Sequence, residues 1–281
     1  MFSSGFTRQD YQHLLANGIT LKGKRVGPAS LFVEIQQGQP DKASFFLIGR
    51  GLQHIINTLV VDRSFYCIPG SQSLLSNPDS YIRDASAFMA KEILAVKPEG
   101  PYIFCGYCFQ AGLTYEIARI LAASGKKVDL LILVDLWATK GHFLAVLKKA
   151  VVILRLLARP FLFVEKSLSF MRRRDRVKRN DNSPQNPSSI IDGMISALSN
   201  YMNELPHYPG TAIIFLPDLG SKILNFLERR AWKRKIGGRL VVKHHKGIHE
   251  DWVNPERIKP ELLYEFKRIF NDYLSEVQKG D

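Results

Sequence analysis

The chain has 281 residues, of which 46% are hydrophobic and 23% are charged, with three cysteines and a formal net charge of +13. This length suits one large domain or two small ones, and the composition is typical of a soluble globular protein. Three cysteines exclude a disulfide framework, and residues 1–17 contain no apolar stretch of signal-peptide length, so we expect a cytoplasmic protein.

Short β-branched and aromatic runs alternate along the chain with stretches of helical periodicity. We expect strands at residues 31–35, 44–48, 65–68, 102–105, 130–134, 211–216 and 239–243. We expect helices at residues 80–96, 111–123, about 190–205 and 260–277. Buried strands that alternate with helices indicate an α/β fold, with a mostly parallel central sheet and helices on both faces.

The alternation is interrupted at residues 141–206, which carry no strand signal. An apolar run begins at Phe143 and ends at Val164, and a basic cluster begins at Lys166 and ends at Arg179. Residues 140–179 include twelve basic residues and two carboxylates, so most of the net positive charge lies in this segment. We expect residues 141–206 to form a basic helical lid, residues 1–30 an N-terminal extension, and residues 31–140 and 207–281 the core.

The basic, apolar character of this insertion suggests several kinds of partner. Positive charge attracts nucleic acid, anionic lipid or an acidic protein. Four cations within the run that starts at Phe143 would be costly inside a bilayer, so a transmembrane span is disfavoured. Peripheral membrane contact through residues 143–164 stays open, and no nucleic acid partner is expected.

A strand-to-helix turn at residues 102–112 carries the clearest functional signal. An apolar strand leads into Gly106-Tyr107-Cys108, and a helix follows from Ala111. A turn of this kind raises one side chain above the edge of a sheet, at the nucleophile elbow that serine usually occupies. Here that side chain is Cys108, and the helix dipole favours its thiolate. The turn therefore predicts acyl transfer through a thioester intermediate.

Cys108 also has less specific interpretations. It could be an ordinary buried cysteine, or it could form a redox Cys-x-x-Cys pair with Cys105. The redox pair is disfavoured because Cys105 falls on the apolar strand, where its side chain is expected to point into the core. A zinc site is disfavoured because the chain has no second ligand pair.

A nucleophilic cysteine needs a base, and the base needs an acid that orients it. His249 follows the last predicted strand, where the hydrolase order of nucleophile, acid and histidine places the base. His244 and His245 lie nearer the strand and are expected to be structural or solvated. Asp135 and Asp218 each follow a predicted strand, and residue chemistry alone leaves both open as the acid.

Several motifs occur in an order that is typical of one family. They are the elbow, Lys97-Pro98-Glu99-Gly100-Pro101-Tyr102, Glu116-Ile117-Ala118, Leu131-Ile132-Leu133-Val134-Asp135, Gly237-Gly238-Arg239-Leu240 and the Gly-x-His that ends at His249. Together they resemble the thioesterase domains of nonribosomal peptide and polyketide synthases, which have the α/β-hydrolase fold. The resemblance covers roughly residues 31–274, apart from the insertion.

The resemblance implies a catalytic triad of Cys108, Asp135 and His249, because the acid of this family follows the strand after the elbow helix. It implies a substrate held on the phosphopantetheine arm of an acyl or peptidyl carrier protein, with no further cofactor and no metal. Release of the chain would occur by hydrolysis or by attack of another nucleophile. The lid would cover the acyl chain, and the cluster from Lys166 to Arg179 would dock the acidic carrier.

Three features depart from the family pattern. Cysteine replaces the usual serine, Gln110 stands where Gly-x-Ser-x-Gly ends in glycine, and Gly49-Arg50-Gly51 replaces a His-Gly pair after the first core strand. We expect one oxyanion N–H near Arg50 and the other at Phe109. These departures leave an alternative, a non-catalytic carrier-docking or membrane-associated protein with the α/β-hydrolase fold.

Overall fold

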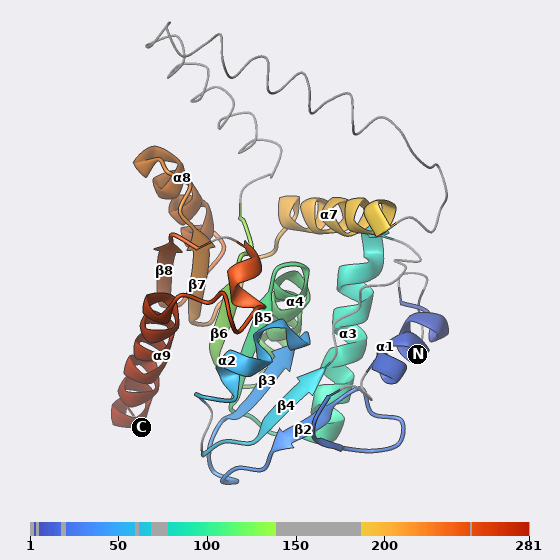
Figure 1. The fold of residues 1–281 in the computed structure, drawn as a ribbon. Helices are drawn as coiled ribbons and strands as arrows, with labels where there is room; N and C mark the ends of the chain where they lie inside the picture. Colours follow the sequence, from blue (N-terminus) through green and yellow to red (C-terminus); the bar gives the residue numbers. More distant parts are fainter. Residues whose placement is uncertain are drawn as a thin grey trace, which may run out of the picture.

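The computed structural model describes residues 3, 6–17, 21–59, 62–68, 78–138, 187–247 and 249–280. Among these residues eight strands form one sheet, in the order β1-β2-β4-β3-β5-β6-β7-β8 (Figure 1). The strands are β1 (Lys24–Arg25), β2 (Val33–Gln36), β3 (Ser44–Ile48), β4 (Phe65–Ile68), β5 (Tyr102–Tyr107), β6 (Val128–Val134), β7 (Ala212–Pro217) and β8 (Leu240–His245). Pairing is antiparallel between β1, β2 and β4 and parallel from β4 through β3 to β8. The expected mostly parallel sheet is confirmed.

Helices cover both faces of this sheet (Figure 1). The helical segments are α1 (Arg8–Asn17), η2 (Arg50–Leu52), α2 (Gln53–Ile56), α3 (Pro78–Val96), α4 (Phe109–Ala123), α7 (Pro187–Asn203), α8 (Lys222–Lys233), η4 (His249–Trp252) and α9 (Pro260–Gly280). One hydrophobic core contains buried side chains of α1, α3, α4, α7 and α8, and a second contains those of α2, η4 and α9. The buried side chains of the strands divide between the two cores because successive residues of a strand point to opposite faces.

The N-terminal segment is part of this fold. Phe6 and Leu14 are fully buried, and the ring of Phe6 lies 5.0 Å from that of Phe88 in α3. Strand β1 extends the sheet by pairing with β2. The described residues between 6 and 30 therefore supply one strand and several core side chains.

Most of the expected lid lies outside the described residues. This applies to residues 139–186, and so to both the apolar run and the basic cluster. The last part of the insertion is helix α7, which packs against α3 and α4. In the part of the chain that the structure describes, no helix has the length and apolarity needed to cross a membrane.

Gly106 allows helix α4 to lie directly against strand β5. A Cβ atom at Gly106 would come 2.1 Å from Oγ1 of Thr114 and 2.9 Å from Cα of Ala111. The Cα cannot yield without moving the helix, so a side chain here would displace α4 and the elbow with it. We expect Gly106→Ala to lower the free energy of unfolding by at least about 1–3 kcal/mol, as measured by urea denaturation.

The control for this substitution is Gly193→Ala. Gly193 lies within α7, and nothing comes within 4 Å of a Cβ added there. Because alanine has the higher helix propensity, the control should be neutral or slightly stabilising. Equal stability of Gly106→Ala and the wild type would contradict the close packing of α4 on β5.

Candidate active site

Cys108 lies between strand β5 and helix α4 in a strained backbone conformation. Its φ and ψ are 56° and −126°, in a region that residues other than glycine rarely adopt. The N–H of Cys108 donates to the carbonyl of Val134 at 2.8 Å, and its carbonyl accepts from the N–H of Ala111 at 3.0 Å. The side chain of Cys108 is partly exposed, and Cys108 is the residue immediately before α4. Strain that the surrounding contacts maintain is typical of a functional site, and this geometry matches the expected elbow.

The other two cysteines differ from Cys108 in burial. Cys67 and Cys105 are buried, and burial raises the pKa of both thiols. Cys105 belongs to the core beneath α2 and α9, whereas Cys108 packs against the core on the opposite face of the sheet. This arrangement disfavours a disulfide between them. Among the described residues, no group of three or more His, Cys, Asp or Glu side chains is placed to hold a metal ion.

Asp135 occupies the strand end next to Cys108. The register of β5 and β6 pairs Tyr107 with Val134, so residues 108 and 135 follow at the same edge of the sheet. Asp135 has a φ of 57°, its N–H donates to the carbonyl of Phe215 at 2.8 Å, and its side chain is 0% exposed. Cys108 and Asp135 are the non-glycine residues with positive φ in the described part of the chain. Backbone strain thus coincides with two of the predicted catalytic residues.

Asp218, the alternative acid, has a different environment. It is exposed after β7, and its Oδ1 accepts the side-chain amide of Asn225 at 2.8 Å and the N–H of Gly220 at 2.9 Å. These hydrogen bonds, that of Asn225 first, hold the pKa of Asp218 below its usual value. The carboxylate therefore caps the turn into α8, and the buried position of Asp135 favours Asp135 as the acid.

The structure brings a histidine to Asp135, and that histidine is His245. Its Nε2 lies 3.1 Å from Oδ1 of Asp135 and also 3.1 Å from Nε1 of Trp252. An indole N–H only donates, so it can bond to Nε2 only when that nitrogen carries no proton. With Asp135 ionised, Nε2 can bond to Asp135 only when it does carry one. The carboxylate and the indole therefore compete for one ring nitrogen.

Sequence reasoning did not place His245 in the site. The usable signal is the pair of adjacent histidines at the end of β8, since neighbouring residues of a strand point to opposite faces. One of the two rings must then enter the interior, where a buried polar group requires partners. His245 is that ring, and only 3% of its side chain is exposed.

His249 is the first residue of η4, in the loop that follows β8. The side chain of His249 lies outside what the structure describes, so its role as the base stays a prediction. The same short helix ends at Trp252, whose buried ring lies edge-on to the ring of His245 at 5.1 Å. In sequence, residue 249 lies between His245, which contacts Asp135, and Trp252, which contacts His245.

The expected oxyanion loop lies against the elbow. Gly49 has a φ of 85°, and a Cβ there would come 2.8 Å from Cγ of Gln110, two residues after Cys108. Arg50, which is exposed, begins η2, and Phe109 begins α4. The first N–H groups of an α-helix have no partner within it, and Phe109 is the first residue of α4. Gly49 therefore leaves space for the side chain of Gln110, and both residues depart from the pattern of the family that the sequence resembles.

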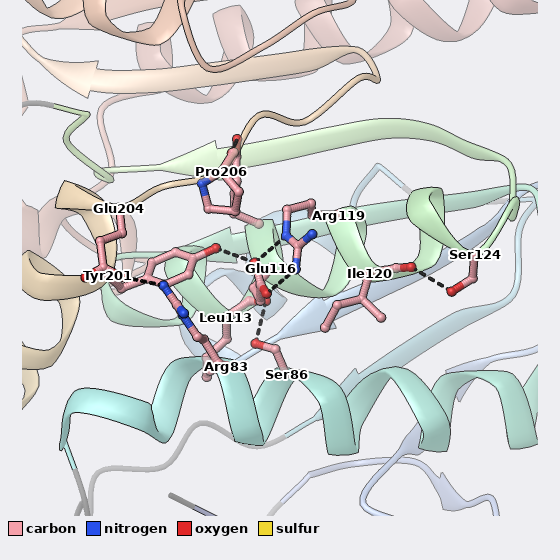
Figure 2. Close-up of polar contacts among 11 residues, drawn as sticks. Arg83, Ser86, Leu113, Glu116, Arg119, Ile120, Ser124, Tyr201, Glu204 and Pro206 are labelled. Atoms are coloured by element: carbon pink, nitrogen blue, oxygen red, sulfur yellow. Dashed lines mark hydrogen bonds and ion pairs between the residues drawn. The ribbon is translucent and has the colours of Figure 1, made fainter.

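Helix α7 is attached to the elbow helix by a buried polar network (Figure 2). The hydroxyl of Tyr201 donates to Oε2 of Glu116 at 2.7 Å, and Arg119 donates to both Glu116 oxygens, at 2.6 and 2.8 Å. Burial, with the charge of Glu116 adding to it, raises the pKa of Tyr201, so the phenol stays neutral and donates. Leu198 packs 2.6 Å from where a Cβ on Gly112 would lie, which brings α7 close to α4. The end of the insertion is thereby fixed to the helix that presents Cys108.

Part of the chain matches a known family of domains. Residues 52–146 match the model of the Thioesterase domain. This match, over about a third of the chain, is to the kind of domain that the sequence motifs resemble. The matched segment contains Cys108 and Asp135 and ends before β8, so it does not test the histidine.

The relatives and solved structures are consistent with the family match. The chain is 30% identical over 118 residues to the non-reducing polyketide synthase cla3 of Cladosporium cladosporioides, a match that covers 37% of this chain and 6% of the synthase. It is 31% identical over 119 residues to the non-reducing polyketide synthase ZEA1 of Gibberella zeae, covering 39% of this chain and 6% of that one. The NocB thioesterase domain from the nocardicin cluster is 17% identical with a TM-score of 0.52, covering 81% of this chain and 93% of that domain. This likeness confirms the α/β-hydrolase fold.

Proposed function

We propose that this protein releases an acyl or peptidyl chain from the phosphopantetheine arm of a carrier protein, through a thioester on Cys108. The observation that carries the proposal is the partly exposed thiol of Cys108 in a strained turn at the start of α4, beside the buried Asp135. The Thioesterase match over residues 52–146 and the synthases among the relatives support the substrate class.

In the proposed reaction, His249 accepts the proton of the Cys108 thiol, and Asp135 stabilises the imidazolium that forms. The thiolate attacks the carbonyl carbon of the carrier-bound thioester. The backbone N–H groups of Phe109 and of the loop at Arg50 hold the resulting oxyanion. The intermediate expels the pantetheine sulfur, which takes the proton from the imidazolium. Water, an amine or a hydroxyl then attacks the carbonyl carbon of the acyl-enzyme and gives its proton to the histidine. The second intermediate expels the Cys108 sulfur, which takes that proton from the imidazolium, and the acid, amide or ester is released.

Two histidines near the end of β8, His245 and His249, are candidates for the base, and substitution of each one distinguishes their roles. We expect His249→Ala to lower kcat for an acyl-pantetheine thioester about 10²–10⁴-fold, because the general base is lost. We expect His245→Gln to lower kcat much less and to keep the pH dependence, because an amide can still bond to Asp135. The measurement is kcat against pH for both variants. A large loss in His245→Gln together with near wild-type kcat in His249→Ala would make His245 the base and refute this part of the proposal.

A further inference from the structure

One face of helix α8 combines exposed cations with exposed apolar side chains. We call it the α8 face, and its residues are Lys222, Ile223, Phe226, Arg229, Arg230 and Lys233. Their spacing of three and four residues places them along one side of the helix. Ile223 is 71% exposed and Phe226 is 60% exposed. Glu228, the acidic residue of α8, is buried on the opposite side and accepts the N–H of Ala138. The α8 face therefore carries positive charge with no carboxylate of its own.

A hollow of about 610 Å³ lies beside this face, between α8 and strand β8. Four cations line it, namely Arg229, Arg230, Lys233 and Lys243. Lys243 lies 3.5 Å from Glu265 and Arg229 donates to the carbonyl of Val242 at 3.2 Å, so these two also have roles in the fold. Within the described residues, no ion pair to Arg230 or Lys233 is found. These two cations remain available to a partner.

We infer that the α8 face, in addition to the cluster expected at residues 166–179, docks an acidic amphipathic helix of the carrier protein, an inference that rests on the proposed function. α8 has 12 residues, so the α8 face is roughly 18 Å long at about 1.5 Å per residue, long enough to accommodate several turns of a partner helix. Phe226 and Ile223 provide apolar anchors, and the surrounding cations provide charge complementarity to carboxylates. A flat anionic membrane would contact the ridge and leave the hollow unfilled, whereas side chains of a protein partner can enter it. The charge and the shape together favour a protein.

The position of the α8 face is compatible with delivery of a substrate arm. Strand β8 passes from the hollow to the site, since Val242 lines the hollow and His245 contacts Asp135. Three residues of a strand span about 10 Å. α8 is the helix after β7 and stands at the β8 end of the sheet (Figure 1). A carrier held there would present its arm to the sheet edge that carries Cys108.

The test compares two substrates with the same octanoyl chain, one on an acyl carrier protein and one on N-acetylcysteamine. We expect Arg230→Glu with Lys233→Glu to raise KM for the carrier-bound thioester at least about tenfold, with kcat unchanged. Turnover of octanoyl-N-acetylcysteamine should not change, because that substrate needs no docking. The matched control is Lys22→Glu with Lys91→Glu, two exposed lysines elsewhere, which changes the net charge equally and should leave both KM values near wild type.

Binding is also measured without turnover, as the Kd of the same carrier for Cys108→Ala with and without the α8 substitutions. A Kd weakened at least about tenfold by Arg230→Glu with Lys233→Glu supports docking even if neither thioester is turned over, a result that would contradict only the proposed function. Unchanged Kd and KM, or an equal effect of the control, would overturn the inference. If Arg230→Glu with Lys233→Glu abolished flotation of the protein with phosphatidylserine vesicles but left the carrier Kd unchanged, the inference would be overturned in favour of a lipid surface.

Discussion

Replacing Cys108 by alanine is expected to lower kcat/KM for acyl-pantetheine thioesters at least about 10⁴-fold while the protein stays folded, because the proposed acyl-enzyme forms on the sulfur that is removed. Alanine keeps the Cβ atom, so the strained backbone at φ 56° experiences the same steric cost in both proteins. The buried residues of α4, from Phe109 to Leu121, are unchanged in this variant. Steady-state kinetics and a urea denaturation curve measure the two expectations separately.

Two further substitutions control this result. Cys67 and Cys105 are buried, and Cys105→Ala should leave turnover of the folded fraction unchanged even where it costs stability. Cys108→Ser keeps a nucleophile of the commoner kind and should retain part of the activity. Wild-type turnover by Cys108→Ala would end the proposed mechanism, and loss of folding would instead indicate a structural role for the thiol.

Asp135→Asn is expected to cause the second large loss, about 10⁴-fold in kcat, because an amide cannot stabilise an imidazolium. Asparagine has nearly the same volume and tolerates positive φ, so the turn at residue 135 should survive. The loss should appear in kcat with both carrier-bound and small thioesters. A stopped-flow burst assay would place the loss in formation of the acyl-enzyme.

Asp218→Asn is the matched control for this prediction. Asp218 is exposed and caps the turn before α8, where asparagine can replace it as a hydrogen-bond acceptor. We expect kcat within about twofold of wild type, because surface substitutions of this kind have small effects. A reversed pattern, with Asp218→Asn inactive and Asp135→Asn active, would move the acid to the end of β7.

Much of the fold was predictable because its strands are strongly apolar. Strands β3 and β4 have the bounds that were predicted, since Phe45, Phe46 and Phe65 are buried on both faces of a parallel sheet. β1 was missed because two residues carry no periodicity. α8 was missed because Ile223 and Phe226 are exposed on the side opposite its buried residues, which obscures the apolar stripe of an ordinary surface helix.

The site was predictable where a local pattern specifies it. Cys108 and Asp135 each follow a buried strand, and parallel pairing alone brings such positions to one edge. The contact between Asp135 and His245 joins residues 110 positions apart in sequence, and it depends on which of two neighbouring rings enters the core. No sequence motif predicts that the indole N–H of Trp252 contacts the same nitrogen of His245. That detail required the tertiary structure.

The proposed mechanism requires the acyl chain to be carried on the sulfur of Cys108. The most direct test is to mix the protein with octanoyl-N-acetylcysteamine, quench with acid, and map the mass increase by peptide mass spectrometry. We expect one octanoyl group on Cys108, removable by hydroxylamine, and none on Cys67 or Cys105. Turnover of the thioester with no adduct at Cys108 under any quench time, or an adduct on another residue that is kinetically competent, would contradict it.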